Sequence, residues 1–364
     1  MELKLNMKSE LKMMSNANAI QQSNELSKEQ DFYPAQYYLN LKSKNHDKWK
    51  ERWECMLLEP RENYLHLPFE EFSLSEINDR GKFFKLNEGD SYNLIKASEN
   101  EIEEASIWVL PGALSTSRYD LSLTLQDINV FFNKINYPLK ESAVIFCPYS
   151  SGENRYTEAM EYNNNDQSKY YSVKIEKFVR KYLIPRIIKE RKLTFIAYSI
   201  GGQELAMIEN ATRYILLNEY NYPITLIQKL FQSVSAICIG YATDIDNLPD
   251  LRFRKIVVLS ASDQGLFIPQ SLYYKLYKVS ICNRPFTALK IDQYETLIFL
   301  GHQVSIEILD GKLNHDGHRL PHYLDAIVKT LPATIFKYIH SLIFDNSNAF
   351  DKLLERELDL LSEM

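Results

Sequence analysis

The sequence predicts an α/β protein: a doubly wound, mostly parallel sheet with an N-terminal α+β extension. From about residue 105, short apolar runs recur along the chain, and such runs are typical of strands buried on both faces. Between two of these runs, residues 172–190 carry apolar side chains at helical spacing. Alternation of strand and helix predicts a parallel sheet covered by helices on both sides. The runs span 107–110, 143–147, 194–197, 235–239, 255–259 and 304–309.

Length and composition limit the class of protein. The chain has 364 residues, of which 45% are apolar, so it can bury the core of one large domain with additions. Its net charge of −6 gives no electrostatic reason to expect binding to nucleic acid. The four cysteines show neither metal-ligand spacing nor the density of a disulfide scaffold, which favours a reducing compartment. No strand is followed by Gly-x-Gly-x-x-Gly or by a P-loop, which disfavours a nucleotide-binding α/β domain, and we expect no cofactor.

Composition changes along the chain predict four regions. Residues 1–30 are polar and predict a flexible arm. Residues 31–104 mix aromatic and charged residues in an N-terminal extension, where alternating runs such as 82–86 predict helical pieces followed by a β-hairpin region, packed onto the main domain or forming a small one. The α/β domain is expected over 105–345, followed by an acidic C-terminal helix over 346–364. No apolar stretch is long enough for a secretory signal or a membrane span. We therefore expect a cytoplasmic protein, or one exported without a cleaved signal peptide.

Residues 193–206 predict a strand, a tight turn and a helix, with one serine at the apex. Ser199 is flanked by Ala197 and Gly201 in the pattern Ala-x-Ser-x-Gly, a variant of Gly-x-Ser-x-Gly. Small residues are needed at the flanks because the turn brings strand and helix close together. Such a turn lifts the serine hydroxyl out of the sheet and points backbone N–H groups at the atom that it attacks. The alternative is a βα loop with an incidental serine.

A serine nucleophile requires a base to take its proton and a carboxylate to orient that base. Asp263 follows the predicted strand 255–259 and is the candidate acid; its alternative role is an Asx turn or helix cap. His318 is the first candidate base, because it follows a glycine in a loop just before a predicted helix. His315 is the second candidate and His302 the third.

The same histidine-rich segment has a metal-site alternative. His315, Asp316, His318 and His322 offer ligand-type side chains within a short stretch. They lack the helical His-Glu-x-x-His spacing that aligns two zinc ligands, so we expect no bound metal.

A hydrolase of this type also needs N–H donors for the oxyanion of the tetrahedral intermediate. The amide of Ile200, directly after the serine, is one candidate. The second is expected in the loop that starts at Pro111 and Gly112, where glycine lets the backbone turn inward and leaves the amide of Ala113 or Leu114 free.

Taken in order, the segments 111–113 and 197–202 with Asp263 and His318 resemble the α/β-hydrolase superfamily, in particular serine esterases and lipases. The resemblance covers about residues 105–340 and implies, in that order, the oxyanion loop, nucleophile, acid and base. This chain departs from the common pattern because it lacks a histidine before Gly112 and has a long gap between Asp263 and His318.

These residues predict a serine hydrolase that cleaves a carboxylic ester through an acyl-enzyme on Ser199. Segments 212–233 and 266–298 are aromatic and aliphatic, and a cap lined by them would favour a lipid, acyl ester or thioester and allow peripheral membrane contact. The alternative for most of these residues is ordinary helix packing. The alternative is a catalytically inactive scaffold that serves as a binding module. The acidic, amphipathic segment 351–364 predicts a terminal helix and also resembles the translocation signals of bacterial type IV secretion effectors.

Overall fold

The computed structural model describes the greater part of the chain from residue 79 to residue 339. The predicted arm over 1–30 and the predicted C-terminal helix over 346–364 lie outside the described residues. Within the described part, no helix combines the length and the apolar character that crossing a membrane requires. The described residues are 79–87, 90–112, 118–136, 143–148, 158, 161–162, 165–241, 249–260, 263, 286–301, 303–304, 307–309, 312–315, 318–333, 335–337 and 339.

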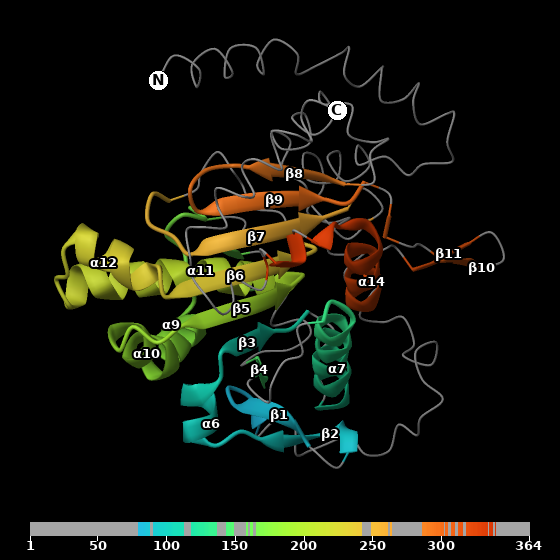
Figure 1. Cartoon of the computed structure of the whole chain (residues 1–364). Coiled ribbons are helices and arrows are strands. Elements are labelled where there is room, and N and C mark those ends of the chain that lie inside the picture. The colour runs from blue at the N-terminus through green and yellow to red at the C-terminus, as the bar shows by residue number, and fades with distance from the viewer. Residues whose placement is uncertain are drawn as a thin grey trace, which may run out of the picture.

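A nine-stranded sheet with the order β2-β1-β4-β3-β5-β6-β7-β9-β8 forms the centre of the described part (Figure 1). The neighbouring strands from β4 to β9 are parallel, whereas the pairings β1–β2, β1–β4 and β8–β9 are antiparallel. The predicted α/β class with a mostly parallel sheet is therefore confirmed. The strands are β1 (Phe83–Asn87), β2 (Asp90–Lys96), β3 (Ile107–Leu110), β4 (Ala143–Phe146), β5 (Leu193–Tyr198), β6 (Val234–Ile239), β7 (Arg254–Leu259), β8 (Thr287–Lys290) and β9 (Glu295–Phe299).

Helices cover both faces of this sheet, as a doubly wound fold requires. One face packs against α7 and α14, and the other against α9, α10, α11 and α12, so the core is divided into two apolar clusters (Figure 1). Residues of β3 alternate between them: Trp108 joins one cluster, whereas Ile107 and Val109 join the other. The helical segments are α6 (Glu99–Glu104), α7 (Arg118–Lys134), α9 (Val173–Phe178), the π-helical η3 (Val179–Leu183), α10 (Ile184–Ile188), α11 (Ile200–Tyr214), the π-helical η4 (Ile215–Glu219), α12 (Ile224–Phe231) and α14 (Leu320–Thr330).

The hairpin β1–β2 extends the sheet toward the N-terminus. The sequence predicts a hairpin region within the extension over 31–104, and the structure joins it to the large sheet: Phe83 pairs with Phe146 of β4 and Phe84 with Ile145. Phe83 and Phe84 are both buried, one in each apolar cluster, so the hairpin contributes to the core on both faces of the sheet. The sheet therefore begins earlier in the chain than the predicted boundary at residue 105.

Two segments near the C-terminus lie elsewhere in the fold than the sequence suggests. The described strand within the predicted run over 304–309 is β10 (Glu307–Leu309), but it does not join the large sheet: it pairs with β11 (Lys312–His315) in a separate two-stranded sheet. The part of the predicted cap over 266–298 that the structure describes contains β8 and most of β9, at the edge of the large sheet. All five residues of β9 are buried, and β9 pairs in parallel with β7, so this apolar run fills the core rather than covering a site.

The other predicted cap segment, 212–233, is also part of the core. It contains the end of α11, η4 and α12, and Ile227, Leu230 and Phe231 of α12 are buried in the cluster on that face of the sheet. In Figure 1, α12 lies at the opposite end of the strands from α14. Because Ser199 lies at the carboxyl end of β5, α12 is too far along the strands to cover it.

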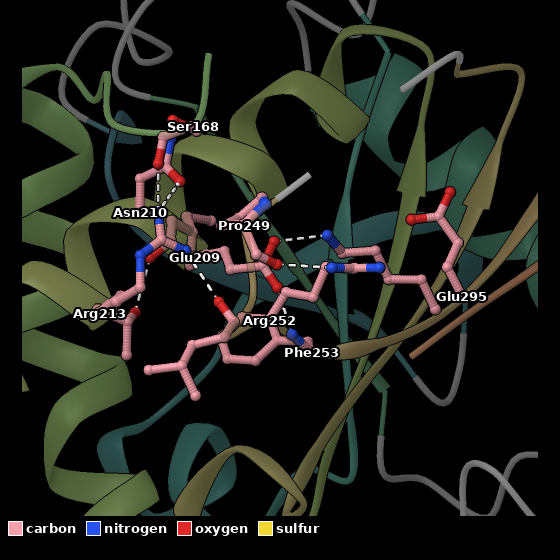
Figure 2. A network of polar contacts seen from close by, with 12 residues as sticks. Ser168, Glu209, Asn210, Arg213, Pro249, Arg252, Phe253 and Glu295 are labelled. Atoms are coloured by element: carbon pink, nitrogen blue, oxygen red, sulfur yellow. Dashed lines mark hydrogen bonds and ion pairs between the residues drawn. The ribbon is translucent and has the colours of Figure 1, made fainter. Parts of the chain in front are cut away.

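A buried polar network anchors the second half of α11 to the start of β7 (Figure 2). Glu209 of α11 accepts a hydrogen bond from the backbone N–H of Phe253 and forms an ion pair with Lys255 of 2.5 Å. One turn further along the helix, Arg213 donates to the side chain of Asn210 at 2.7 Å and to the carbonyl of Leu251 at 2.9 Å. The charged groups are thus satisfied inside the protein, and they fix where α11 lies on the sheet.

Candidate active site

Ser199 is the only residue between β5, which ends at Tyr198, and α11, which begins at Ile200. Its backbone has φ 55° and ψ −122°, a conformation that costs a residue with a side chain roughly 1–3 kcal/mol. Its N–H donates to the carbonyl of Ile239 in β6 at 2.9 Å, which helps to hold this conformation. The side chain is half-buried, so its hydroxyl remains within reach of a substrate.

The small residues of the serine turn are explained by close backbone contacts. A Cβ atom on Gly201 would lie 2.4 Å from the carbonyl oxygen of Leu110 in β3, and one on Gly202 would lie 2.3 Å from the ring of Tyr241. Ala197 is fully buried between β3 and β6. Larger residues at these positions would push α11 away from the sheet and displace the serine.

The structure brings together the three residues expected to form a triad. The Ser199 hydroxyl and Nε2 of His318 are 2.7 Å apart, and Nδ1 of His318 is 2.7 Å from Oδ2 of Asp263. An imidazole that donates its Nδ1 proton to a carboxylate leaves Nε2 free to accept a proton from the serine. The side chain of Asp263 is fully buried and that of His318 is only 10% exposed, so the pair is shielded from water.

Sequence reasoning missed two tyrosines that hold the acid and the base. Tyr323 of α14 donates its hydroxyl to Oδ2 of Asp263 at 2.6 Å. Tyr198, at the end of β5, donates its hydroxyl to the carbonyl of His318, and the two rings stack with centroids 5.4 Å apart. A signal for Tyr323 was available: it lies on the apolar stripe of a predicted helix, and a hydroxyl buried there needs a partner.

Gly240 was missed as well, although it adjoins both members of the Asp–His pair. It follows β6 with φ +62°, in the left-handed region that favours glycine. A Cβ atom at this position would lie 3.3 Å from Cε1 of His318 and 3.4 Å from Oδ2 of Asp263. Gly240 therefore leaves the space in which the imidazole and the carboxylate meet.

The oxyanion donors predicted from the sequence are described in part. Ile200 is the first residue of α11, so its N–H is one of those at the helix N-terminus that no intrahelical carbonyl accepts. The loop after β3 also reaches the serine, because a Cβ atom on Gly112 would lie 3.7 Å from the Cβ of Ser199. Ala113 and Leu114, the candidates for the second donor, lie outside the described residues.

The other histidines considered for the base lie elsewhere in the chain. His315 is the last residue of β11, where its backbone pairs with Glu307, and His322 lies within α14. His302 is outside the described residues. Where the structure describes the chain, no group of three or more His, Cys, Asp or Glu side chains could hold a metal ion.

A small cavity lies at the carboxyl ends of β3 and β4, next to the serine turn. Its lining includes Leu110, on whose carbonyl Gly201 packs, and Glu204, which is one helical turn after Ile200. Most of the lining is apolar, with one ion pair between Lys174 and Glu158 at 3.6 Å. The other lining residues are Phe146, Pro148, Ile175 and Ile208.

Chemically, this arrangement can move a proton from a hydroxyl to an imidazole whose positive charge a buried carboxylate stabilises. No model of a known protein family matches this chain, and no curated protein sequence does. The site geometry is therefore the basis for a functional assignment.

Proposed function

We propose that this protein is a serine hydrolase that cleaves a carboxylic ester through an acyl-enzyme on Ser199. The observation that carries the proposal is the continuous chain of two 2.7 Å hydrogen bonds from the Ser199 hydroxyl through His318 to Asp263. The positive φ of Ser199 adds support, because backbone strain of this kind is typical of residues held in place for a function.

In the first half of the reaction, the Ser199 oxygen attacks the ester carbonyl carbon while Nε2 of His318 takes the hydroxyl proton. The carbonyl oxygen becomes an oxyanion and accepts a hydrogen bond from the Ile200 N–H. Asp263 stabilises the imidazolium that forms. His318 then gives its proton to the leaving alcohol, the carbon–oxygen bond to that alcohol breaks, and the acyl group remains on Ser199.

The second half repeats these steps with water as the nucleophile. His318 removes a proton from the water molecule as it attacks the acyl carbon, and a second tetrahedral intermediate forms. When this intermediate collapses, the proton returns from His318 to the Ser199 oxygen. The carboxylic acid leaves, and the free enzyme is restored.

The topology supports a relation to the α/β-hydrolases. Ser199 follows β5, Asp263 follows β7 and His318 precedes α14, in the chain order Ser, Asp, His that is found in these enzymes. The carboxyl ends of parallel strands meet at one edge of a sheet, which is where sites in open α/β folds form. The resemblance of the sequence to the α/β-hydrolases rests mainly on the serine turn. The positions of Asp263 and His318 relative to the strands and helices add a second line of support.

For the substrate, we propose an ester with an apolar acyl group. Apolar side chains of Leu110, Phe146 and Ile208 near the serine turn support this choice; the cavity that they line has room for roughly one water molecule, so the acyl chain would bind outside it. Comparing p-nitrophenyl acetate, butyrate and octanoate tests the choice. A kcat/KM that rises with chain length supports an apolar acyl site, and a preference for acetate contradicts it.

Labelling with a fluorophosphonate probe tests the proposed function. The full-length protein should be labelled, and Ser199→Ala should abolish the label because the nucleophilic oxygen is gone. Ser199→Ala and His318→Ala should also each lower the turnover of p-nitrophenyl butyrate on the order of 10³-fold or more.

Ser233→Ala is the matched control. This serine is also half-buried, and its hydroxyl donates to the carbonyl of Leu230 at 2.6 Å, after α12. The control should retain both labelling and turnover. A folded wild-type protein that neither reacts with the probe nor hydrolyses the ester would contradict the proposal and favour a binding scaffold.

A further inference from the structure

Tyr323 occupies a position on α14 where an apolar residue would be expected. The helix faces the core with residues spaced three or four apart, and Tyr323 is fully buried among them. A phenylalanine would fill this position without the cost of burying a hydroxyl. The other residues of the stripe are Leu320, Leu324, Ile327 and Leu331.

The Tyr323 hydroxyl is directed at the acid of the candidate triad. It donates to Oδ2 of Asp263 at 2.6 Å, and the same oxygen lies 2.7 Å from Nδ1 of His318. Tyr323 and Asp263 are 60 residues apart in the chain, whereas His318 lies just before the helix that carries Tyr323. A single helix thus fixes the carboxylate relative to the imidazole, although Asp263 itself lies outside helices and strands.

We propose that Tyr323 is a positioning residue that holds the Asp263 carboxylate against His318 and reduces the negative charge presented to the imidazole. The proposal rests on the proposed function, because it concerns the acid and base of that reaction. A donor shared by the same oxygen competes with Nδ1–H for its electron density. The His318 ring therefore gains a proton at lower pH than it would beside a carboxylate without this donor, and it remains an effective base over a wider range.

The electrostatic surroundings allow Tyr323 to act as a constant donor. Burial is the main cause that raises the pKa of Tyr323 well above its ordinary value, and the negative charge of Asp263 is the second cause. The Tyr323 hydroxyl therefore stays protonated at neutral pH. Tyr198 at the end of β5 stacks on the His318 ring, and Arg319 and His322 are the charged or titratable residues at the start of α14. None of these is altered in Tyr323→Phe.

The titration of the His318 ring in the full-length protein tests the proposal. Nitrogen-15 NMR of histidine-labelled samples gives the pH midpoint for each of the seven histidines, and His318→Gln identifies the His318 signal. Tyr323→Phe should raise this midpoint by about half a pH unit or more, since one hydrogen bond to a charged group is lost. The acid limb of kcat/KM for p-nitrophenyl butyrate should move in the same direction, with kcat reduced about ten-fold.

Tyr162→Phe is the matched control. Tyr162 is also buried, and its hydroxyl lies 3.4 Å from that of Tyr241. This variant removes a buried hydroxyl without touching the Asp263–His318 pair, so it should leave the His318 midpoint unchanged. If Tyr323→Phe leaves the midpoint unchanged or lowers it, Tyr323 is only a structural residue and the proposal fails.

A second probe keeps the test decisive if Tyr323→Phe does not fold. Incorporating 3-fluorotyrosine at position 323 keeps the hydroxyl but makes it a stronger donor, so the His318 midpoint should fall. No movement with this residue contradicts the proposal. The NMR readout is independent of turnover: a protein that shows these shifts but hydrolyses no ester contradicts the proposed function alone.

Discussion

At the residue scale, the site depends on positions where backbone and side chain have little freedom. Ser199 has a positive φ, and Gly201 and Gly202 are needed because a Cβ atom on either would overlap a neighbouring segment. Gly240 is needed for a similar reason beside the acid and base, because its missing side chain leaves room for the His318 ring. These constraints explain why small residues surround the candidate nucleophile in the sequence.

Gly240→Ala is expected to lower kcat/KM about 10- to 100-fold, because the new methyl group would press on the His318 ring and displace it from Ser199. It should also lower Tm, since alanine is strained at φ +62°. Gly81→Ala separates the two effects: Gly81 has φ 75° but lies beside β1, outside the candidate site. This control should lose a similar amount of stability and keep its activity. Equal losses of activity in both variants would mean that Gly240 acts through stability alone.

Sequence reasoning reaches residues whose roles are local. Ser199 and Asp263 follow predicted strands, and His318 precedes a predicted helix. All three are therefore expected at the same edge of the sheet, close enough to form one site. Tyr198 and Tyr323 could not be found this way, because each forms its hydrogen bond with a partner 120 or 60 residues away. His318 is preferred to His315 for a local reason too: it directly precedes a predicted helix, and α14 begins at Leu320.

At the scale of elements, α11 links the serine turn to a buried ion pair. Ser199 precedes its first residue, and Glu209 in its second half meets Lys255 of β7 at 2.5 Å with side chains only 2% and 3% exposed (Figure 2). Movement of the helix would break this pair and the glycine contacts at its start. The helix that presents Ser199 is therefore held at both ends.

Lys255→Met should destabilise the protein by about 3–5 kcal/mol, because it leaves the Glu209 carboxylate buried without its counter-ion. Urea unfolding followed by circular dichroism measures the change. Lys229→Met is the matched control, since Lys229 pairs with Glu190 at 2.7 Å but both side chains are more than half exposed. The control should cost no more than about 1 kcal/mol. If the two variants lost similar amounts of free energy of unfolding, burial of the Lys255–Glu209 pair would not make it more important for stability than the exposed pair.

The elements that sequence reasoning misassigned share one property. The strand over 295–299 mixes polar and apolar residues, and it lies in a segment whose aromatic and aliphatic side chains suggest either a cap or ordinary packing. The run over 304–309 was assigned to the large sheet, but its described part pairs locally with β11. An apolar run indicates burial, whereas its neighbour in a sheet is decided by contacts between distant segments.

At the scale of the whole molecule, the sheet order places the candidate site. β5 lies between β3 and β6 in the interior of the sheet, and β7 is the next strand but one, so the residues after β5 and β7 meet at the same edge. The fold class could be predicted because apolar runs alternate with helical patterns, and five of the six runs coincide with strands of the large sheet, β3 to β7. The β1–β2 hairpin could not be placed, since Phe83 of β1 pairs with Phe146, more than sixty residues further along the chain.

The central claim is that the Ser199 oxygen forms a covalent bond with the acyl group of a substrate. Mass spectrometry of the intact protein, quenched in acid within the first turnover of p-nitrophenyl butyrate, tests this most directly. We predict one butyryl group per chain, located on the peptide that contains Ser199 and absent from Ser199→Ala. Ester hydrolysis with no adduct, or an adduct that persists in Ser199→Ala, would contradict the account.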